Sequence, residues 1–286
     1  MRSNYGAVQR LFASHPTTTP PAIRLVFAQR IVPVLTIAIP VRNEAPTIGV
    51  LLWRIRAVFQ EYAREYEVLV FDDGSTDGTA EVLQPYTKAL PLTVLGRPTP
   101  VGYAHAVDAL LREASRRTRY PRRDAVILMQ GDFTDQPEHI PELVRRFEGG
   151  ADVVIAERTT EPAMPAPERN LRRLARLVLR PFLSTPGTND PFGTYRLIRL
   201  SIIRDLLKPL GDKPLVTMDG WGGNLELFHA TRAVARRIES VAFTARYDLR
   251  PRASRHRPLA DAYALFRAGL VLRKRVPSRA PRPATA

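Results

Sequence analysis

The chain has 286 residues, the size of one large domain or of one domain with extensions. A composition of 44% apolar and 25% charged residues excludes a largely disordered chain, and the absence of cysteine excludes disulfides, cysteine-based zinc sites and thiol catalysis. The 26 prolines exclude a long coiled coil, and 43 basic against 28 acidic residues give a net charge of +15.

Strand and helix patterns alternate through the first half of the chain. Residues 1–33 read as a flexible N-terminal arm, because the Thr-Thr-Thr-Pro-Pro run at 17–21 does not suit regular structure. An apolar run at 34–39 suits a buried strand, and apolar residues then recur at helical spacing from Ile48 to Tyr62, with Pro46 near the helix start. The same reasoning predicts strands at 67–71, 92–95, 125–129 and 152–156, and helices at 79–86, 103–114 and 140–147.

The alternation weakens after Glu157. We expect a basic helix near 168–183, a strand near 193–198, a helix near 222–235 and a strand near 238–243. Repeated strand–helix units predict an α/β fold with a mostly parallel central sheet and helices on both faces. Residues 34–257 would form the main domain, and 258–286 a basic amphipathic segment with a disordered tail.

No segment of the sequence suits a membrane span. The longest clearly apolar stretch, 31–41, contains two prolines and is about half of the roughly twenty residues that a spanning helix needs. Arg10 and His15 interrupt any signal-peptide core. We therefore expect a cytoplasmic protein that touches a membrane only at its surface.

Polar clusters follow three of the predicted strands. They are Pro40-Val41-Arg42-Asn43-Glu44, the run from Asp72 to Thr79, and Gln130-Gly131-Asp132-Phe133-Thr134-Asp135. Ligands of open parallel sheets bind just beyond the carboxyl ends of the strands, so the clusters predict a binding site at this edge. Each cluster taken alone also suits a helix cap.

The residue types in these clusters favour a nucleotide diphosphate. A carboxylate at Asp72 or Asp73 accepts two hydrogen bonds from the ring N–H groups of uracil or guanine. Asp132 and Asp135 are hard oxygen ligands suited to Mg²⁺ or Mn²⁺. Neither a dinucleotide-binding glycine motif nor a P-loop follows the first strand.

Three segments resemble the family-2 glycosyltransferases of GT-A fold: IPVRNEAPTI, VFDDGSTDGT and the acidic end of the fourth strand. The segments MQGDFTDQPEHIPEL and NDPFGTYRL are similar to polyprenyl-phosphate (dolichyl-phosphate) mannose synthases. The resemblance covers residues 34–257 and implies a catalytic domain. Its implied reaction is the inverting transfer of a hexose, mannose or glucose, from a GDP- or UDP-linked sugar.

The resemblance also implies roles for individual residues. Pro40, Arg42 and Glu44 would touch the nucleoside, Asp72 the base, and Asp132 the metal. Asp190 and Glu226 match acidic positions on the acceptor side, although a turn former and a helix-surface residue are the simpler interpretations. Four arginines match positions near the donor diphosphate or the acceptor phosphate: Arg158, Arg172, Arg196 and Arg246. For Arg172, a plain helix-surface position is the alternative.

The metal site departs from the family pattern at Gln130, where the family has an acidic residue. An amide oxygen still coordinates a cation, but one negative charge is missing. Three interpretations stay open: Asp135 compensates, nearby arginines replace part of the metal's role, or the chain is a weakly active relative with a degenerate metal site.

The acceptor decides whether a general base is needed. A phosphate monoester is largely ionised at neutral pH and needs no base, whereas a hydroxyl acceptor needs a placed carboxylate, for which Asp219 is the candidate. Arginine-rich stretches favour a polyprenyl-phosphate acceptor over a soluble or saccharide hydroxyl.

A partner surface is also predicted. Apolar residues at 263–272 lie among Arg267, Arg273 and Lys274, which suits either an amphipathic helix on an anionic membrane or a core-packing helix. A nucleic-acid partner is disfavoured, because the basic cluster at 169–180 contains no stacking aromatic residue.

Overall fold

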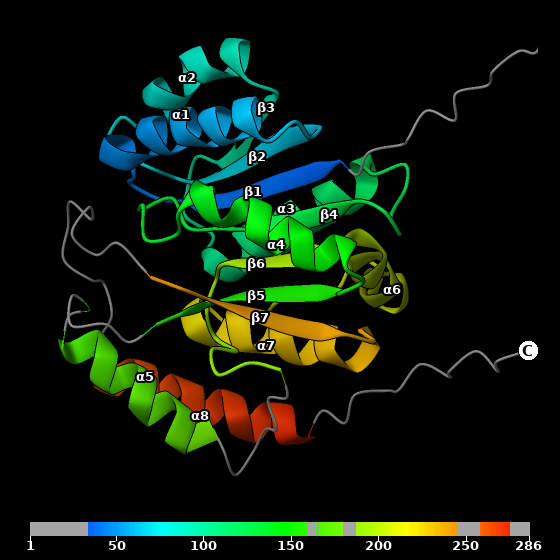
Figure 1. Cartoon of the computed structure of the whole chain (residues 1–286). Helices are drawn as coiled ribbons and strands as arrows, with labels where there is room; N and C mark the ends of the chain where they lie inside the picture. The colour runs from blue at the N-terminus through cyan, green and yellow to red at the C-terminus, as the bar shows by residue number, and fades with distance from the viewer. Residues whose placement is uncertain (1–33, 160–163, 165, 180–186, 245–257, 275–286) are drawn as a thin grey trace, which may run out of the picture. The chain divides into compact units, whose positions relative to one another are not determined.

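The computed structural model describes residues 34–159, 164, 166–179, 187–244 and 258–274 (Figure 1). These residues form a mixed α/β structure around a seven-stranded sheet with the order β3-β2-β1-β4-β6-β5-β7. The strands are β1 (Leu35–Val41), β2 (Tyr66–Asp73), β3 (Leu92–Arg97), β4 (Ala125–Leu128), β5 (Val153–Arg158), β6 (Arg196–Arg199) and β7 (Ile238–Phe243).

Most strand pairs are parallel, as the sequence predicts. β1 pairs in parallel with β2 and β4, β2 with β3, and β5 with β7. β6 is the exception, since it runs antiparallel between β4 and β5. The predicted α/β fold class, with a mostly parallel sheet, is therefore confirmed, and one antiparallel strand is inserted between β4 and β5.

Successive side chains of the buried strands alternate between the two faces of the sheet, so the apolar core has one part on each face. In β1, Leu35, Ile37 and Ile39 contribute to one core, and Ala38 contributes to the other. Successive side chains of a strand point to opposite faces, so a strand covered on both sides must be apolar throughout.

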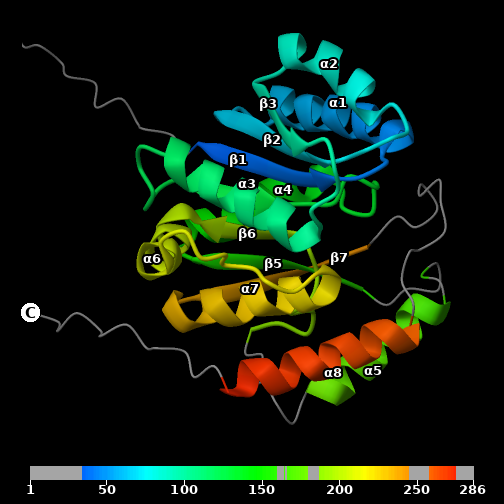
Figure 2. The same ribbon diagram turned by 180° about the vertical axis from the view of Figure 1, so that it is seen from behind.

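Helices cover both faces. The first core is closed by α1 (Ala45–Glu61), α2 (Thr79–Ala89) and α4 (Ile140–Glu148), with the short 3₁₀ helix η1 (Pro137–His139) leading into α4. The second is closed by α3 (Tyr103–Arg117), α6 (Leu200–Leu210) and α7 (Gly220–Val234), which Figure 2 shows from behind. Pro46, near the start of α1, has the backbone angle that a first helical turn requires.

Two further helices, α5 (Ala166–Leu179) and α8 (Pro258–Lys274), pack together beside α7. They share a third apolar core with Phe192 and with Trp221 and Leu225 of α7. Leu265, Ala268 and Leu272 of α8 are buried in it, so one side of the amphipathic C-terminal segment packs against the protein. No helix among the described residues has both the length and the apolar character to cross a membrane.

Candidate functional site

The ends of β1 and β2 meet at the predicted edge of the sheet. Val41 of β1 pairs with Asp72 of β2, so both strands end at the same level. The backbone N–H of Asn43 donates to Ser75 Oγ over 2.9 Å, and the Asn43 amide oxygen accepts from the N–H of Thr76 over 2.8 Å. These reciprocal bonds join the two loops directly.

The β4 loop lies against the same place. A Cβ atom on Gly131 would lie 2.9 Å from Val41 Cγ1 and 3.5 Å from Cγ of Glu44. Glu44 is buried, and its backbone N–H donates to Thr79 Oγ1 over 3.0 Å. Glu44, the 72–79 turn and the turn around Asp132 therefore converge, as the sequence predicts.

The two adjacent aspartates of the β2 turn have different surroundings. Asp73 is buried and accepts hydrogen bonds from the N–H groups of Val101 (2.6 Å) and Gly102 (3.1 Å), so it anchors the entry into α3. Asp72 is half-buried and accepts from Ser75 N–H through Oδ1 over 3.0 Å. Asp72 is thus the better placed of the two to meet a ligand.

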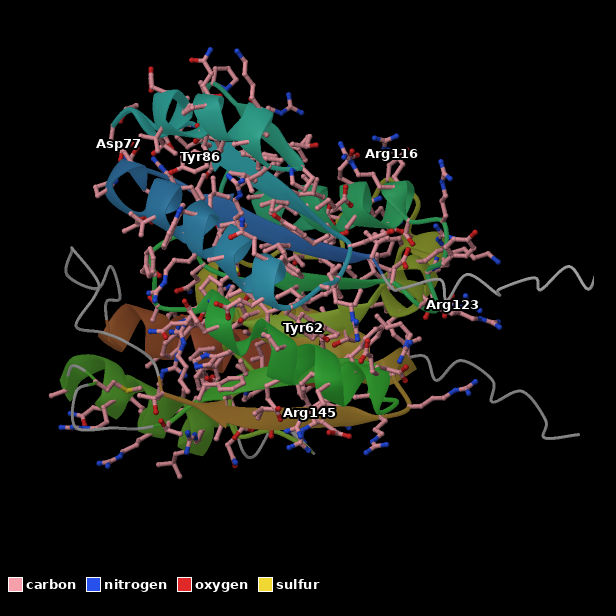
Figure 3. The ribbon with its side chains drawn as sticks, turned by 45° about the horizontal axis from the view of Figure 1, so that its top comes forward. Tyr62, Asp77, Tyr86, Arg116, Arg123 and Arg145 are labelled. Carbon is pink, nitrogen blue, oxygen red and sulfur yellow. The ribbon has the colours of Figure 1, made fainter. Side chains whose placement is uncertain are left out.

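The start of α1 is held by Asp77, which Figure 3 labels. Its carboxylate accepts from the N–H groups of Ala45 over 3.0 Å and of Thr79 over 3.1 Å. Burial alone would raise the pKa of Asp77, but hydrogen bonds from Thr79 and Ala45 outweigh it and lower the pKa. Asp77 of the β2 turn therefore fixes the start of α1 at this edge of the sheet.

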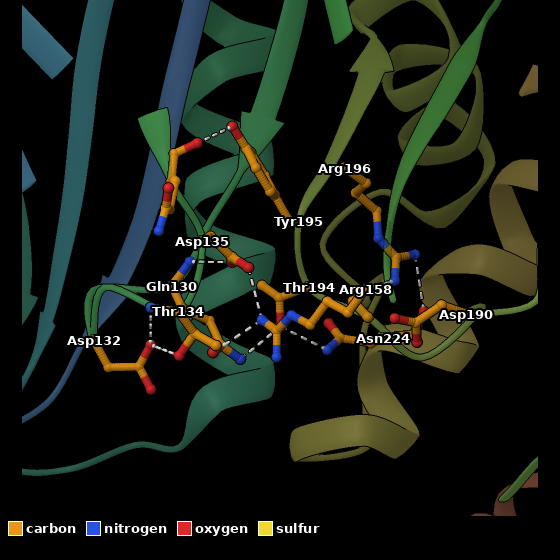
Figure 4. Close-up of polar contacts among 12 residues, drawn as sticks. Gln130, Asp132, Thr134, Asp135, Arg158, Asp190, Thr194, Tyr195, Arg196 and Asn224 are labelled. Atoms are coloured by element: carbon orange, nitrogen blue, oxygen red, sulfur yellow. Dashed lines mark hydrogen bonds and ion pairs between the residues drawn. The ribbon is translucent and has the colours of Figure 1, made fainter. Parts of the chain in front are cut away.

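A buried polar network follows β4 (Figure 4). Arg158, at the end of β5, donates to Asp135 Oδ1 over 2.6 Å and to Gln130 Oε1 over 3.4 Å. Asp135 Oδ2 accepts from the backbone N–H of Gln130 over 2.9 Å, and the Gln130 amide donates to Thr194 Oγ1 over 3.0 Å. Burial raises the pKa of Asp135, against the opposing charge of Arg158.

Asp132 lies in a turn with an unusual backbone. Thr134 donates to Asp132 Oδ1 from its backbone N–H over 3.1 Å and from its hydroxyl, which orients the carboxylate without neutralising its charge. Phe133 between them has a φ of 67°, a conformation that bulky residues adopt at an energetic cost. The aspartate is thus held in one orientation at the sheet edge.

No group of three or more His, Asp or Glu side chains that could hold a metal ion is present in the part of the chain that the structure describes. Both oxygens of Asp135 accept hydrogen bonds from Arg158 and Gln130, and the Gln130 amide is held between Arg158 and Thr194. Asp132 is therefore the residue of the predicted metal set with the suitable chemistry. One or two carboxylates together with substrate phosphates are what Mg²⁺ commonly uses.

Arg172 and Asp190 form an ion pair inside the protein. Arg172 Nη1 lies 2.6 Å from Asp190 Oδ2, and both side chains are 1% exposed. The guanidinium carbon lies 5.6 Å from the Phe192 ring centre and 5.2 Å from that of Trp221. The alternative of a plain helix-surface position for Arg172 is wrong, because the pair joins α5 to the loop before β6.

Arg196 is fully buried beneath that loop. Its guanidinium donates to the carbonyl oxygens of Pro191 (3.2 Å), Gly193 and Asn224 (3.1 Å). Burial lowers the pKa of Arg196 to about 10, so it stays charged at neutral pH. The observed contacts make Arg196 a support for the loop rather than a group facing a ligand.

The remaining predicted carboxylates also contact backbone. Asp219 Oδ1 accepts from the N–H of Ala104 at the start of α3 over 2.8 Å. Glu226 is buried in α7 and accepts from Thr217 N–H over 2.7 Å and Met218 N–H over 3.0 Å, so the helix-surface interpretation is wrong for it.

Two further predicted residues lie at the end of β1, where Pro40 is half-buried and Arg42 is exposed. Arg246 lies outside the described residues.

Sequence reasoning missed the polar residues that connect these groups. Asn224 donates to Thr194 Oγ1 over 3.0 Å and accepts from the Tyr103 hydroxyl over 2.7 Å, which joins α7, the loop before β6 and α3. Thr194 was visible only as part of NDPFGTYRL, and Asn224 stands in a helix without any motif. Nothing in the local pattern indicates that they meet.

Comparison with known proteins places this geometry in a family. The Glycosyl transferase family 2 profile matches residues 36–207, which is more than half of the chain. An undecaprenyl-phosphate 4-deoxy-4-formamido-L-arabinose transferase from Photorhabdus laumondii is 28% identical over 183 residues, 61% of this chain and 51% of that protein. A bactoprenol glucosyl transferase of Shigella phage SfV is 28% identical over 204 residues, 70% of this chain and 63% of that protein. The chain thus spans about half to two thirds of the length of these relatives.

Solved structures agree on the fold. Mannosyl-3-phosphoglycerate synthase from Rubrobacter xylanophilus matches with a TM-score of 0.58 at 19% identity. The match covers 89% of this chain and 79% of the synthase chain. Glucosyl-3-phosphoglycerate synthase from Mycobacterium tuberculosis, solved with Mn²⁺, UDP and glucosyl-3-phosphoglycerate, has a TM-score of 0.55 at 21% identity, covering 86% and 81%. The predicted GT-A fold is therefore confirmed, and the chain belongs to glycosyl transferase family 2.

Proposed function

We propose that the protein transfers a hexose from a nucleotide-diphosphate sugar to a polyprenyl phosphate, with inversion at the anomeric carbon. The observation that carries this proposal is the convergence of Glu44, the Asp72 turn and Asp132 at the carboxyl edge of a GT-A sheet. The names of the two relatives, which act on undecaprenyl phosphate and bactoprenol, support the choice of acceptor.

The donor nucleotide would bind across the ends of β1 and β2. Asp72 accepts from the N–H groups of the base, while Pro40, Arg42 and Glu44 contact the nucleoside. Asp73 serves this site indirectly, because its hydrogen bonds to Val101 and Gly102 hold the neighbouring turn. UDP and GDP both offer base N–H groups to a carboxylate, and the UDP complex of the mycobacterial neighbour supports testing UDP-sugars first.

A divalent cation, Mg²⁺ or Mn²⁺, would be held by Asp132 together with the donor's phosphate oxygens. Such an ion stabilises the negative charge that develops on the leaving diphosphate. Gln130 and Asp135 instead position Arg158, whose buried guanidinium adds positive charge beside the same turn. With Gln130 in place of an acidic residue, Asp135 is a carboxylate of this turn that pairs with Arg158.

The acceptor phosphate needs no general base. Its second pKa is near 6, so at neutral pH it is largely the dianion and attacks the anomeric carbon directly. Asp219, the candidate base for a hydroxyl acceptor, already accepts from the start of α3 through Oδ1. This contact supports a helix-positioning role for Asp219.

The test is a transfer assay with UDP- and GDP-linked glucose and mannose, with and without Mn²⁺. The acceptors are a water-soluble short-chain prenyl phosphate, a polyprenyl phosphate in detergent, and 3-phosphoglycerate. We expect transfer to both prenyl phosphates, a product of inverted anomeric configuration, and a rate that rises with pH, is half-maximal near pH about 6 and reaches a plateau above about pH 7. Efficient transfer to 3-phosphoglycerate, with the prenyl phosphates untouched, would instead support the soluble hydroxyl acceptor that the structural neighbours use.

A further inference from the structure

The paired helices α5 and α8 expose an apolar surface on the side away from their shared core. We call this the α5/α8 surface. Its six side chains are 39–67% exposed, although the opposite sides of both helices are buried. They are Leu174 and Leu177 of α5, and Tyr263, Phe266, Leu270 and Val271 of α8.

Helical spacing gathers these side chains on outward faces. Leu174 and Leu177 are three residues apart, as are Tyr263 and Phe266, and Leu270 follows four residues after Phe266. Residues three and four apart lie on one side of a helix. The two helices contact each other and lie side by side in both views (Figures 1 and 2), so these exposed residues stand on neighbouring helices.

The exposed charges that the structure describes around the apolar residues have one sign. The exposed charged side chains that the structure describes on these two helices are all basic: Arg173, Arg176, Arg267, Arg273 and Lys274. Exposed apolar side chains interspersed with arginine and lysine are the composition of a helix lying in the interface of an anionic membrane. A second copy of the same face would bring these charges against one another, which disfavours self-association.

We propose that the α5/α8 surface docks the protein on an anionic phospholipid bilayer. The apolar side chains enter the acyl boundary, and the basic residues contact the lipid phosphates. Part of the reason for this partner rests on the proposed function, since a polyprenyl phosphate resides in a membrane. The opposite side of α5 carries Arg172, whose pair with Asp190 joins this helix to the loop before β6. Docking through α5 therefore holds that loop at a fixed distance from the lipid surface.

The experiment is sedimentation of the full chain with two kinds of vesicle. One is phosphatidylcholine alone, and the other contains about 30% phosphatidylglycerol, which gives it an anionic surface. The double variant Leu177→Glu/Tyr263→Glu changes the two most exposed apolar residues of the surface, at 67% and 63% exposure. The matched control Val50→Glu/Trp53→Glu changes residues of α1 with 54% and 61% exposure. We expect the first variant to lose at least about tenfold in vesicle affinity and the control to bind like the wild type.

Charge is tested separately. The variant Arg173→Gln/Arg176→Gln/Arg267→Gln should lose roughly fivefold in affinity per charge, and added salt should weaken binding of the wild type. Its control, Arg119→Gln/Arg122→Gln/Arg123→Gln, removes the same charge from another exposed stretch, where Figure 3 shows Arg123. If both triple variants bind equally, net charge rather than this surface is responsible, and the proposal fails.

The outcomes separate docking from catalysis. Both surface variants should retain transfer to the short-chain prenyl phosphate and lose transfer to polyprenyl phosphate embedded in anionic vesicles. Absence of wild-type vesicle binding overturns the docking proposal even where soluble transfer proceeds, whereas binding without any transfer overturns only the proposed function. A wild-type dimer that Leu177→Glu/Tyr263→Glu dissociates, without vesicle binding, would assign the surface to self-association and also overturn the proposal.

Discussion

Breaking the buried pair of Arg172 and Asp190 tests whether these residues support the fold or act on a ligand. Each side chain is 1% exposed, and their charged atoms lie 2.6 Å apart. Removing one partner of such a pair leaves a buried charge without its counterion, which costs about 3–5 kcal/mol. We therefore expect Asp190→Ala and Arg172→Met each to lower the free energy of unfolding by about that amount.

The double variant should cost less than the sum of the single variants. Replacing both charges leaves no uncompensated ion, so the loss falls mainly on packing and on the contacts of the guanidinium with Phe192 and Trp221. Urea unfolding followed by tryptophan fluorescence is the assay, because Trp221 stacks on Phe192 with ring centres 4.8 Å apart. The surface pair Arg145–Glu142 supplies the control, and Figure 3 labels Arg145. The variant Arg145→Met should leave the unfolding midpoint nearly unchanged.

A different result would refute this reasoning. If Arg172→Met unfolds at the wild-type urea concentration but has lost transfer activity, Arg172 acts on donor or acceptor, as the sequence resemblance implies. Arg172→Lys extends the test to a variant that keeps the charge. A supporting role predicts an intermediate loss of stability with activity following the folded fraction, because lysine lacks the planar guanidinium that contacts both the Phe192 and the Trp221 ring.

Three other perturbations separate ligand-binding from structural carboxylates. Asp72→Asn should weaken nucleotide binding by calorimetry with little change in melting temperature, whereas Asp73→Asn should mainly lower the melting temperature; the reverse pattern would exchange their roles. Asp132→Ala should abolish the thermal stabilisation that Mn²⁺ adds to a bound nucleotide, and retention of that stabilisation would move the metal ligand elsewhere. The Glu113 carboxylate, bonded to Arg116 and Arg117, has its pKa lowered to about 2, first by the hydrogen bond from Arg116. The folded pKa of Glu113 lies below the unfolded value of about 4.5. The wild type should therefore have a slightly larger free energy of unfolding than Glu113→Gln. This difference should be fully present above pH about 4.5 and vanish as pH falls to about 2. Urea midpoints across this range measure that difference, and a gap that persists at pH 2 would contradict it.

The elements of the first half of the chain follow from local pattern. Apolar runs in β1, β2 and β4 are continuous because these strands are covered on both faces, and helical spacing alone identifies α1 and α3. The site edge was predictable for the same reason. Parallel strands end at one edge, so polar residues directly after them must lie near each other wherever the rest of the chain goes.

The position of the strand expected near 238–243 is confirmed, but the direction and neighbours of the later elements were not predicted. The strand expected near 193–198 is observed as Arg196–Arg199, and it runs antiparallel between β4 and β5. The C-terminal amphipathic stretch suited a core-packing helix somewhat better than a membrane surface, and the structure buries one side of α8 while exposing the other. Direction and neighbours of a strand or helix depend on distant partners, which periodicity does not report.

The sequence by itself determined the fold class, the family resemblance and the edge of the sheet where a ligand would bind, because these depend on residue spacing within single elements. Only the tertiary structure decided the tasks of the individual charges: Asp73 anchors a turn, Asp135 pairs with Arg158, and Arg172 pairs with Asp190. The sequence shows the same residue whether its carboxylate caps a helix, pairs with an arginine or binds a ligand. Its partner comes from another part of the chain, and that partner sets what the charge can do.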